Sequence, residues 1–397
     1  MAKSNLYIFN PEHDLALASG ESNYMAPASA RQMANDLALL PAWYAEKGAS
    51  VLASSAYNVD FLKAMVEVFD HQVNLVTPPE LAYESDFEVV PWGWNPVLRK
   101  RLLVGGMDES KFPSLEYLEQ LRFYSHRSQV VKLLPDLQLN EYFCGESYYL
   151  EKPEAWLTFV EARESCLLKA PLSGSGKGLN WCKGKFTSSI SGWCERISTL
   201  QGGVIGEPIY NKVQDFAMEF VSDGKGKVSF AGYSLFYTGK SGMYDGNRLL
   251  SDKRVAELLS KYVPLECLTA LKVRLEKELS AIIGVFYKGY LGVDMMVCYF
   301  PGEKVDFRIH PCVEINLRMN MGVVAHKLTG HYLSPNTEGE FGITYYPSDG
   351  IAWQESQQKT QENPLLVENG RIVSGYMSLV PVTKQSRYLA WIRCSYK

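Results

Sequence analysis

A short polar row on a predicted strand is the clearest chemical signal in the sequence. Polar and apolar residues alternate through segment 313–318, VEINLR. Because successive side chains of a strand point to opposite faces, Glu314, Asn316 and Arg318 share one face. Carboxylate and amide oxygens suit Mg²⁺, and a guanidinium suits a carboxylate or phosphate through its fork. A half-exposed edge strand with solvated polar residues would show the same pattern, so this row alone leaves both interpretations open.

A further carboxylate lies in an apolar setting earlier in the chain. Asp294 is flanked by Gly-Val on one side and Met-Met-Val on the other, although strands disfavour Asp unless another group satisfies its charge. If the neighbouring strand carries Glu314, the two carboxylates can share metal ions. The alternative is a turn residue at the end of a strand.

A strand that ends in Lys169 and enters a glycine-rich loop occupies segment 167–178, LLKAPLSGSGKG. Glycines let backbone N–H groups approach phosphate oxygens, and the lysine adds a positive charge. A P-loop is excluded, because Pro171 and Gly178 stand where that motif needs Gly and Ser or Thr. A dinucleotide fingerprint is weak, since it needs a helix after the glycines and LNWC at 179–182 is typical of a strand. A lid over a triphosphate and an ordinary flexible hairpin both remain.

Two acids border a polar linker between apolar strands. The first strand runs into Glu207 in VIGEPIY (204–210), and the next begins with Asp215 in DFAMEF (215–220). This arrangement suits a hinge along which adenine and ribose would lie, with the acids accepting hydrogen bonds from the amino group and hydroxyls. Ordinary surface charge is the default alternative for either acid.

The polar segment NPEHDL at 10–15 follows the first predicted strand. Open α/β sheets bind ligands at the carboxyl ends of their strands. One interpretation is therefore that Glu12, His13 or Asp14 contacts the substrate. A polar turn that caps a helix is the favoured interpretation, because such residues are common caps.

The elements that must position these residues follow two patterns. In the first third, strands alternate with helices, which favours a parallel α/β sheet because parallel strands need helical crossovers. The predicted strands are 6–9, 51–53, 73–76 and 87–90, and the helices are 30–46 with an interruption near Pro41, 59–69, 96–103 and 114–123.

The middle of the chain favours antiparallel pairing, because its strands are joined by short turns. The predicted strands are 166–169, 179–182, 204–207, 216–221, 228–237, 291–299 and 306–316; the helical stretches are 253–283, broken at Pro264, and 321–328. The tail after Pro335 is polar and punctuated by Pro and Gly up to Gly370, and ends in strands at 371–380 and 388–394.

Composition narrows the classes of function. The 397 residues carry a net charge of −4 and no Lys/Arg run, so no nucleic-acid or anionic-membrane surface is expected. No stretch suits a signal peptide or a membrane span. The eight cysteines form no C-x-x-C pair, which indicates free thiols in a reducing compartment. A cytoplasmic protein is expected.

These pieces, in this order, resemble the ATP-grasp family over residues 125–330. The resemblance matches Lys169 to the phosphate-binding lysine, Glu207 to the hinge acid and Asp215 to the ribose acid. It matches the loop to the family's lid, with residues Gly174, Ser175, Gly176, Lys177 and Gly178.

The metal side of the resemblance is similarly specific. Asp294 matches the first metal-binding acid, Glu314 and Asn316 the E-x-N metal pair, and Arg318 the arginine that follows in carboxylase-like members. Segment 321–330, MGVVAHKLTG, is similar to carbamoyl-phosphate-synthetase-like members. There are two departures. Gly292 stands where some ligases carry arginine, and His126-Arg127 and Lys132 give no clean match to an earlier ATP-contacting lysine.

The resemblance implies an α/β and α+β chain: a parallel α/β domain (1–124), a lid subdomain (125–205), a metal-site subdomain with antiparallel sheets (206–334) and a C-terminal β extension (335–397). It implies a ligase that uses ATP and Mg²⁺ (or Mn²⁺) to activate a carboxylate for attack by an amine or similar nucleophile. Arg318 and Lys169 would be its catalytic residues, and a homodimer is compatible with it. The alternative is a non-catalytic nucleotide-binding protein with the same fold, and a dehydrogenase is a distant third.

Overall fold

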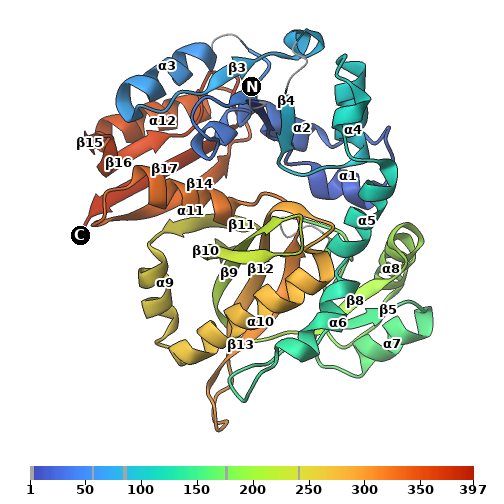
Figure 1. Ribbon diagram of the computed structural model, residues 1–397. Helices are drawn as coiled ribbons and strands as arrows, with labels where there is room; N and C mark the ends of the chain where they lie inside the picture. The colour runs from blue at the N-terminus through green and yellow to red at the C-terminus, as the bar shows by residue number, and fades with distance from the viewer. Residues whose placement is uncertain (1–3, 56–57, 84–86, 175–177, 240–241) are drawn as a thin grey trace.

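Three β-sheets with helices on their faces make up the computed structural model (Figure 1). The structure describes residues 4–55, 58–83, 87–174, 178–239 and 242–397. Within these ranges no helix is both long and apolar enough to cross a membrane. All eight cysteines are buried and none forms a disulfide.

The N-terminal sheet is parallel, as the sequence predicted, with the order β3-β2-β1-β4. Its strands are β1 (Ser4–Ile8), β2 (Ser50–Leu52), β3 (Asn74–Val76) and β4 (Phe87–Pro91). Its helical segments are α1 (His13–Ser19), α2 (Ala28–Asp36), η1 (Leu40–Trp43), α3 (Asn58–Phe69) and η2 (Pro78–Ala82). The long helix predicted at 30–46 is wrong in extent: α2 ends at Asp36, and a separate 3₁₀ turn with Pro41 in its first turn follows.

A second, antiparallel sheet has the order β5-β8-β6-β7. It contains β5 (Tyr148–Leu150), β6 (Cys166–Lys169), β7 (Leu179–Cys182) and β8 (Val204–Pro208), and α7 (Pro153–Glu161) and α8 (Ser188–Gln201) pack on it. The connection from the first sheet consists of α4 (Pro96–Val104), η3 (Glu109–Lys111), α5 (Leu115–Ser125) and α6 (Ser128–Leu137). The predicted hairpin around the glycine loop is confirmed, because β6 pairs directly with β7.

The third sheet has nine strands in the order β13-β12-β9-β10-β11-β14-β17-β16-β15. Its first five strands along the chain are β9 (Lys212–Asp223), β10 (Val228–Thr238), β11 (Tyr244–Leu249), β12 (Lys288–Tyr299) and β13 (Phe307–Asn316), and β13 lies at one edge. Its helices are α9 (Asp252–Leu259), α10 (Leu265–Ile283) and α11 (Met321–Tyr332). The predicted break at Pro264 is confirmed, since α9 and α10 are separate helices and Pro264 directly precedes α10.

The C-terminal residues continue this third sheet. Strand β14 (Thr337–Tyr345) pairs with β11, and β17 (Tyr388–Tyr396), β16 (Arg371–Ser378) and β15 (Leu366–Glu368) follow outward, with α12 (Ile351–Glu362) between β14 and β15 in the chain. Neither β14 nor α12 was predicted, because the stretch from Pro335 to Gly370 shows little apolar periodicity.

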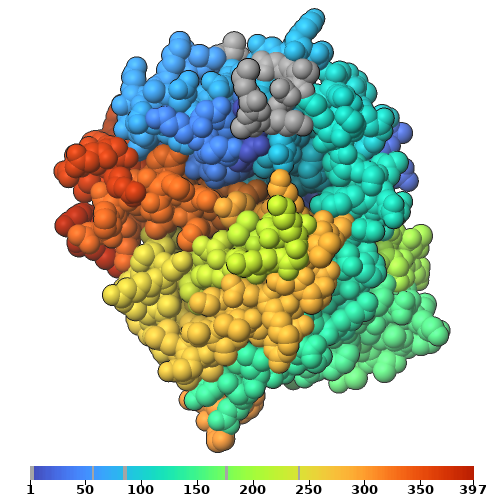
Figure 2. Space-filling view, in the orientation of Figure 1, coloured from blue at the N-terminus to red at the C-terminus, as the bar shows by residue number. Residues whose placement is uncertain are grey.

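The C-terminal strands also join the N-terminal unit through a shared core. Trp43 is 1% exposed and donates a hydrogen bond from Nε1 to the Leu379 carbonyl over 2.5 Å. The same hydrophobic cluster contains Ile372 and Ile392. In the space-filling view, blue N-terminal residues lie against orange and red C-terminal residues at the upper left (Figure 2). Residues 335–397 therefore extend the third sheet and also pack against the N-terminal residues. The predicted domain boundaries stay predictions.

Candidate active site

Asp294 and Glu314 lie opposite each other on the adjacent antiparallel strands β12 and β13. Residues paired in this way have Cβ atoms about 5 Å apart. Burial, and then the negative charge of Glu314, raise the pKa of Asp294 to about 7. The two carboxylates that the sequence analysis expected to meet are therefore neighbours whose charges repel each other.

Asn316 lies in a polar contact network beside this pair. Its Nδ2 donates to Asp294 Oδ2 over 3.1 Å, and its Oδ1 accepts from Arg318 Nη2 over 2.8 Å. The side chain is buried, yet its amide faces polar groups on both sides. A carbonyl oxygen has two lone pairs, so Oδ1 keeps one acceptor site besides the bond from Arg318.

The guanidinium of Arg318 is held by a residue of the N-terminal domain. Arg318 Nε donates to Asp14 Oδ1 over 2.7 Å and Nη2 to Asp14 Oδ2 over 2.8 Å, while Nη1 donates to the Met319 carbonyl over 3.1 Å. Burial by itself would raise the pKa of Asp14, but the charges of Arg318, His13 and Arg127 outweigh it, and the pKa is lowered. Asp14 lies in the first turn of α1, within the predicted polar segment, and it also forms this long-range pair with Arg318.

Arg127 reaches the same site and was missed as a site residue. Its Nη1 donates to the Ala170 carbonyl over 2.7 Å and to Ser173 Oγ over 2.8 Å, and its Nη2 lies 2.6 Å from Glu314 Oε1. Arg127 directly precedes α6. One guanidinium therefore connects the start of the glycine-rich loop with strand β13.

The beginning of that loop also touches Asp14. A Cβ on Gly174 would stand 2.0 Å from Asp14 Oδ2, so only glycine fits there without a shift. Gly178 has φ +75°, a left-handed conformation that favours glycine, and its carbonyl accepts from the Ala170 N–H over 2.8 Å. The predicted lid residues Ser175, Gly176 and Lys177 lie outside the described residues.

Lys169 and Glu207 form an ion pair at the centre of the second sheet. Lys169 Nζ lies 2.5 Å from Glu207 Oε2, and the residues are 6% and 3% exposed. Ser147 Oγ donates to the other oxygen, Glu207 Oε1, over 3.2 Å. The structure thus brings together two residues that the sequence analysis assigned to different parts of a nucleotide.

Asp215 lies on the same face of the third sheet as Asp294, at the neighbouring position on that face. Along β9 and β12, Asp215 pairs with Met296, and the pair Ala217–Asp294 comes next on the same face. Asp215 Oδ2 lies 2.5 Å from Lys212 Nζ and accepts from Thr238 Oγ1 over 2.6 Å. Its carboxylate is therefore already oriented by a lysine and a hydroxyl.

His310 lies on β13 in the same row as Glu314 and was not predicted. It is fully buried, and neither ring nitrogen has a hydrogen-bond partner among the residues that the structure describes. Burial lowers its pKa to about 4, with Lys169 acting in the same direction and Glu207 against it. The ring is neutral at physiological pH and offers one donor and one acceptor.

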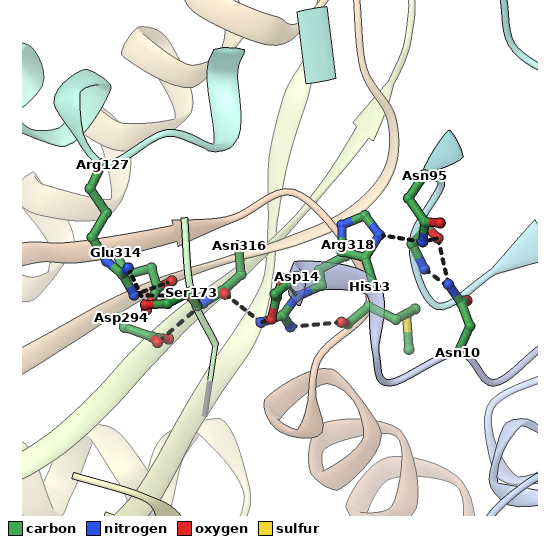
Figure 3. A network of polar contacts seen from close by, with 12 residues as sticks. Asn10, His13, Asp14, Asn95, Arg127, Ser173, Asp294, Glu314, Asn316 and Arg318 are labelled. Atoms are coloured by element: carbon green, nitrogen blue, oxygen red, sulfur yellow. Dashed lines mark hydrogen bonds and ion pairs between the residues drawn. The ribbon is translucent and has the colours of Figure 1, made fainter. Parts of the chain in front are cut away.

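The site holds three ion pairs. The pairs are Lys169–Glu207, Arg127–Glu314 and Arg318–Asp14. Figure 3 shows the last two pairs, with Asn316 connecting Arg318 to Asp294, and the contact between His13 and Asn95 at one end. The contacts of Arg318 and Arg127 connect α1, the start of the glycine-rich loop and β13.

The donor set suits a hard cation. In the described part of the chain, no group of three or more His, Cys, Asp or Glu is arranged to hold a metal ion. The site instead offers the carboxylates of Asp294 and Glu314 with the Asn316 amide oxygen. Mg²⁺ takes one or two carboxylates and completes its shell with water and substrate phosphates, so these residues fit Mg²⁺ that arrives with a nucleotide.

Comparisons with known proteins identify the fold. No protein-family model and no curated protein matches the chain. A biotin carboxylase from Campylobacter jejuni, solved as a β-γ-ATP complex, is 13% identical with a TM-score of 0.51, covering 99% of this chain and 87% of its own. The biotin carboxylase domain of 2-oxoglutarate carboxylase from Hydrogenobacter thermophilus, solved with MgADP, ADP and bicarbonate, is 10% identical with a TM-score of 0.51, covering 100% and 87%. Both are ATP-grasp proteins, and the chain has the ATP-grasp fold.

Proposed function

We propose that this protein is a Mg²⁺- and ATP-dependent ligase. It would convert a carboxylate into an acyl phosphate, which an amine or similar nucleophile then attacks. The observation that carries the proposal is the pairing of Asp294 with Glu314 beside Asn316, on a fold shared with two proteins whose structures contain adenine nucleotides.

The nucleotide would lie across the two sheets. Glu207 and Asp215 would accept hydrogen bonds from adenine and ribose, and the buried Lys169 would contact phosphate. Arg127 supplies a cation where the family resemblance expects an early lysine, and it already contacts the loop at Ser173. Phosphoryl transfer from ATP rests on positioning and charge neutralisation. The positive charges of Lys169, Arg127 and Arg318 suit this reaction.

Asp294, Glu314 and Asn316 would hold the cation. Bound Mg²⁺ neutralises charge on the β- and γ-phosphates during phosphoryl transfer. The raised pKa of Asp294 follows from its burial beside Glu314, and a divalent cation between two such carboxylates relieves that repulsion.

Arg318 would bind the acceptor carboxylate or the acyl phosphate. Its fork is occupied by the carboxylate of Asp14, which has the same chemistry as a substrate carboxylate. A substrate would therefore exchange with Asp14 at the fork, replacing one bidentate pair by another.

A binding and turnover experiment tests the proposal. Isothermal titration calorimetry with AMP-PNP, with and without Mg²⁺, should show Mg²⁺-dependent nucleotide binding. ADP release is then followed over a panel of carboxylic acids, with hydroxylamine to trap acyl phosphates as hydroxamates. Absence of nucleotide binding rejects the proposal.

A non-catalytic nucleotide-binding protein is the second candidate. The occupied fork of Arg318 favours it, because a substrate must first displace Asp14. Nucleotide binding without ADP or hydroxamate formation across the panel would select this candidate. A cytoplasmic location is proposed for either, since eight unpaired buried cysteines suit a reducing compartment.

A further inference from the structure

The register of β9 against β12 places one buried acid beyond the metal side of the site. Asp215 pairs with Met296, Ala217 with Asp294 and Glu219 with Gly292. Alternate residues share a face, so the three pairs form a row with Asp294 in the middle. If the nucleotide extends from Asp215 to Asp294, as in the proposed function on which this inference rests, Glu219 lies past the terminal phosphate, where the reacting partners must meet.

Glu219 is buried without a cationic partner. It is 2% exposed, and its one hydrogen bond among the described residues comes from Asn320 Nδ2 to Oε2 over 2.8 Å. The described part of the chain gives it no ion pair within 4.0 Å. Burying a carboxyl group in this way costs stability. Such a cost is typical of a residue that binds a ligand.

Two glycines leave the space that the Glu219 carboxyl occupies. A Cβ on Gly292 would stand 2.5 Å from Asn320 Nδ2 and 2.6 Å from Glu219 Oε2, and a Cβ on Gly322 would stand 2.0 Å from Glu219 Oε1. Neither glycine has a positive φ, so backbone conformation does not require glycine at either place. The requirement is space for the carboxyl and the amide.

A neutral hydroxyl group lies close to Oε1. Ser234 Oγ would be 2.6 Å from a Cβ on Gly322, and it accepts from Asn247 Nδ2 over 2.6 Å. Both residues are almost fully buried. The positive charge of Arg318 acts on Glu219, but the fork of Arg318 faces Asp14.

We propose that Glu219, held by Asn320 in the space left by Gly292 and Gly322, forms the subsite for the nucleophile and selects an amine. Its Oε1 accepts an N–H hydrogen bond, whereas a carboxylate nucleophile has no hydrogen to donate to Oε1. Gly292 leaves this place open to the Glu219 carboxyl, since a side chain at position 292 would meet Glu219 Oε2.

Saturation-transfer NMR on the protein saturated with Mg²⁺ and AMP-PNP tests this assignment. The probes are a set of small primary amines with their isosteric alcohols and carboxylates. The wild type should bind amines in preference to both. Glu219→Gln should lose about tenfold in amine affinity, the size expected for a hydrogen bond to a charged group, with little change for alcohols.

Gly322→Ala provides a second variant that keeps Glu219, and its methyl group should block Oε1 and weaken amine binding as well. Glu141→Gln, which alters an exposed pair with Lys304, is the matched control and should bind amines like the wild type. Calorimetry verifies nucleotide saturation of each protein.

Absence of amine binding, or amine binding that neither site variant weakens, overturns the subsite. Failure of the wild type to bind AMP-PNP instead overturns the proposed function and the subsite with it.

Discussion

Asp14 and Arg318 form a two-pronged ion pair between residues 304 positions apart in the chain. Asp14 lies in α1, near the start of the chain, and Arg318 comes shortly after the end of β13. The same Asp14 oxygen that accepts from Arg318 Nη2 lies against Gly174 of the glycine-rich loop. Three parts of the chain therefore meet at one carboxylate, and a change there should affect both stability and loop position.

Replacing Asp14 by Asn should destabilise the protein. The side chains of Asp14 and Arg318 are 23% and 12% exposed, and breaking a mostly buried pair by removing one charge costs on the order of 3 kcal/mol. Urea denaturation measures the loss. Glu141→Gln at an exposed pair, with side chains 83% and 52% exposed, should cost under about 1 kcal/mol. Equal effects for the two variants would show that the Asp14 pair contributes no more than a surface contact.

Replacing Glu314 by Ala should abolish ADP formation while the fold remains. The change removes one of the two carboxylates assigned to Mg²⁺ and should lower turnover by roughly 100-fold or more, as loss of a charge-stabilising group does. ADP release at saturating Mg²⁺ is the measurement, with circular dichroism to verify the fold. Glu362→Ala, at an exposed position on α12, serves as the control. Full activity of the Glu314 variant would reject the metal assignment.

Replacing Arg318 by Lys should cause a large loss of activity. Lysine keeps the charge but lacks the planar fork that contacts both oxygens of Asp14. Hydroxamate formation at increasing carboxylate concentration would separate a higher KM, expected if the fork binds the acceptor, from a lower kcat. An unchanged rate would show that Arg318 does not touch the substrate.

Glu219 should make the stability of the protein fall as pH rises. Burial raises its pKa to about 8, with Asp294 acting in the same direction and Asn320 and Arg318 against it. Because the folded pKa lies above the ordinary value of 4.5, the folded state keeps a proton that the unfolded chain loses between these two values. The stability contribution is therefore complete below pH 4.5, decreases as pH rises through about 8, and is absent above.

Denaturation of the wild type and Glu219→Gln at pH 5 and pH 9 measures this effect. Each pKa unit corresponds to about 1.4 kcal/mol, so the wild type should lose on the order of 3 kcal/mol more than the variant over this range. Asp294 titrates in both proteins, and its effect largely cancels in the comparison. Parallel pH dependence of the two proteins would show that the Glu219 carboxyl ionises normally.

The sequence by itself determined the local elements and the faces of the strands. Strands β6 and β7 have the predicted bounds, Cys166–Lys169 and Leu179–Cys182, because short apolar runs beside a Gly/Ser loop leave few alternatives. Strand alternation placed Glu314 and Asn316 on one face, where both contact the site. These features depend on neighbours in the chain, which a single sequence contains.

Tertiary structure alone decided which distant side chains meet. Asp14 resembled a turn residue, Arg127 an unmatched basic residue, and Glu219 one polar residue within an apolar strand. Their roles depend on strand order and register: Glu219 reaches the end of the row because β9 pairs with β12 from the pair Lys288–Asp223 onward. Such pairing is set by contacts between segments far apart in the chain, and no local period of hydrophobic residues specifies it.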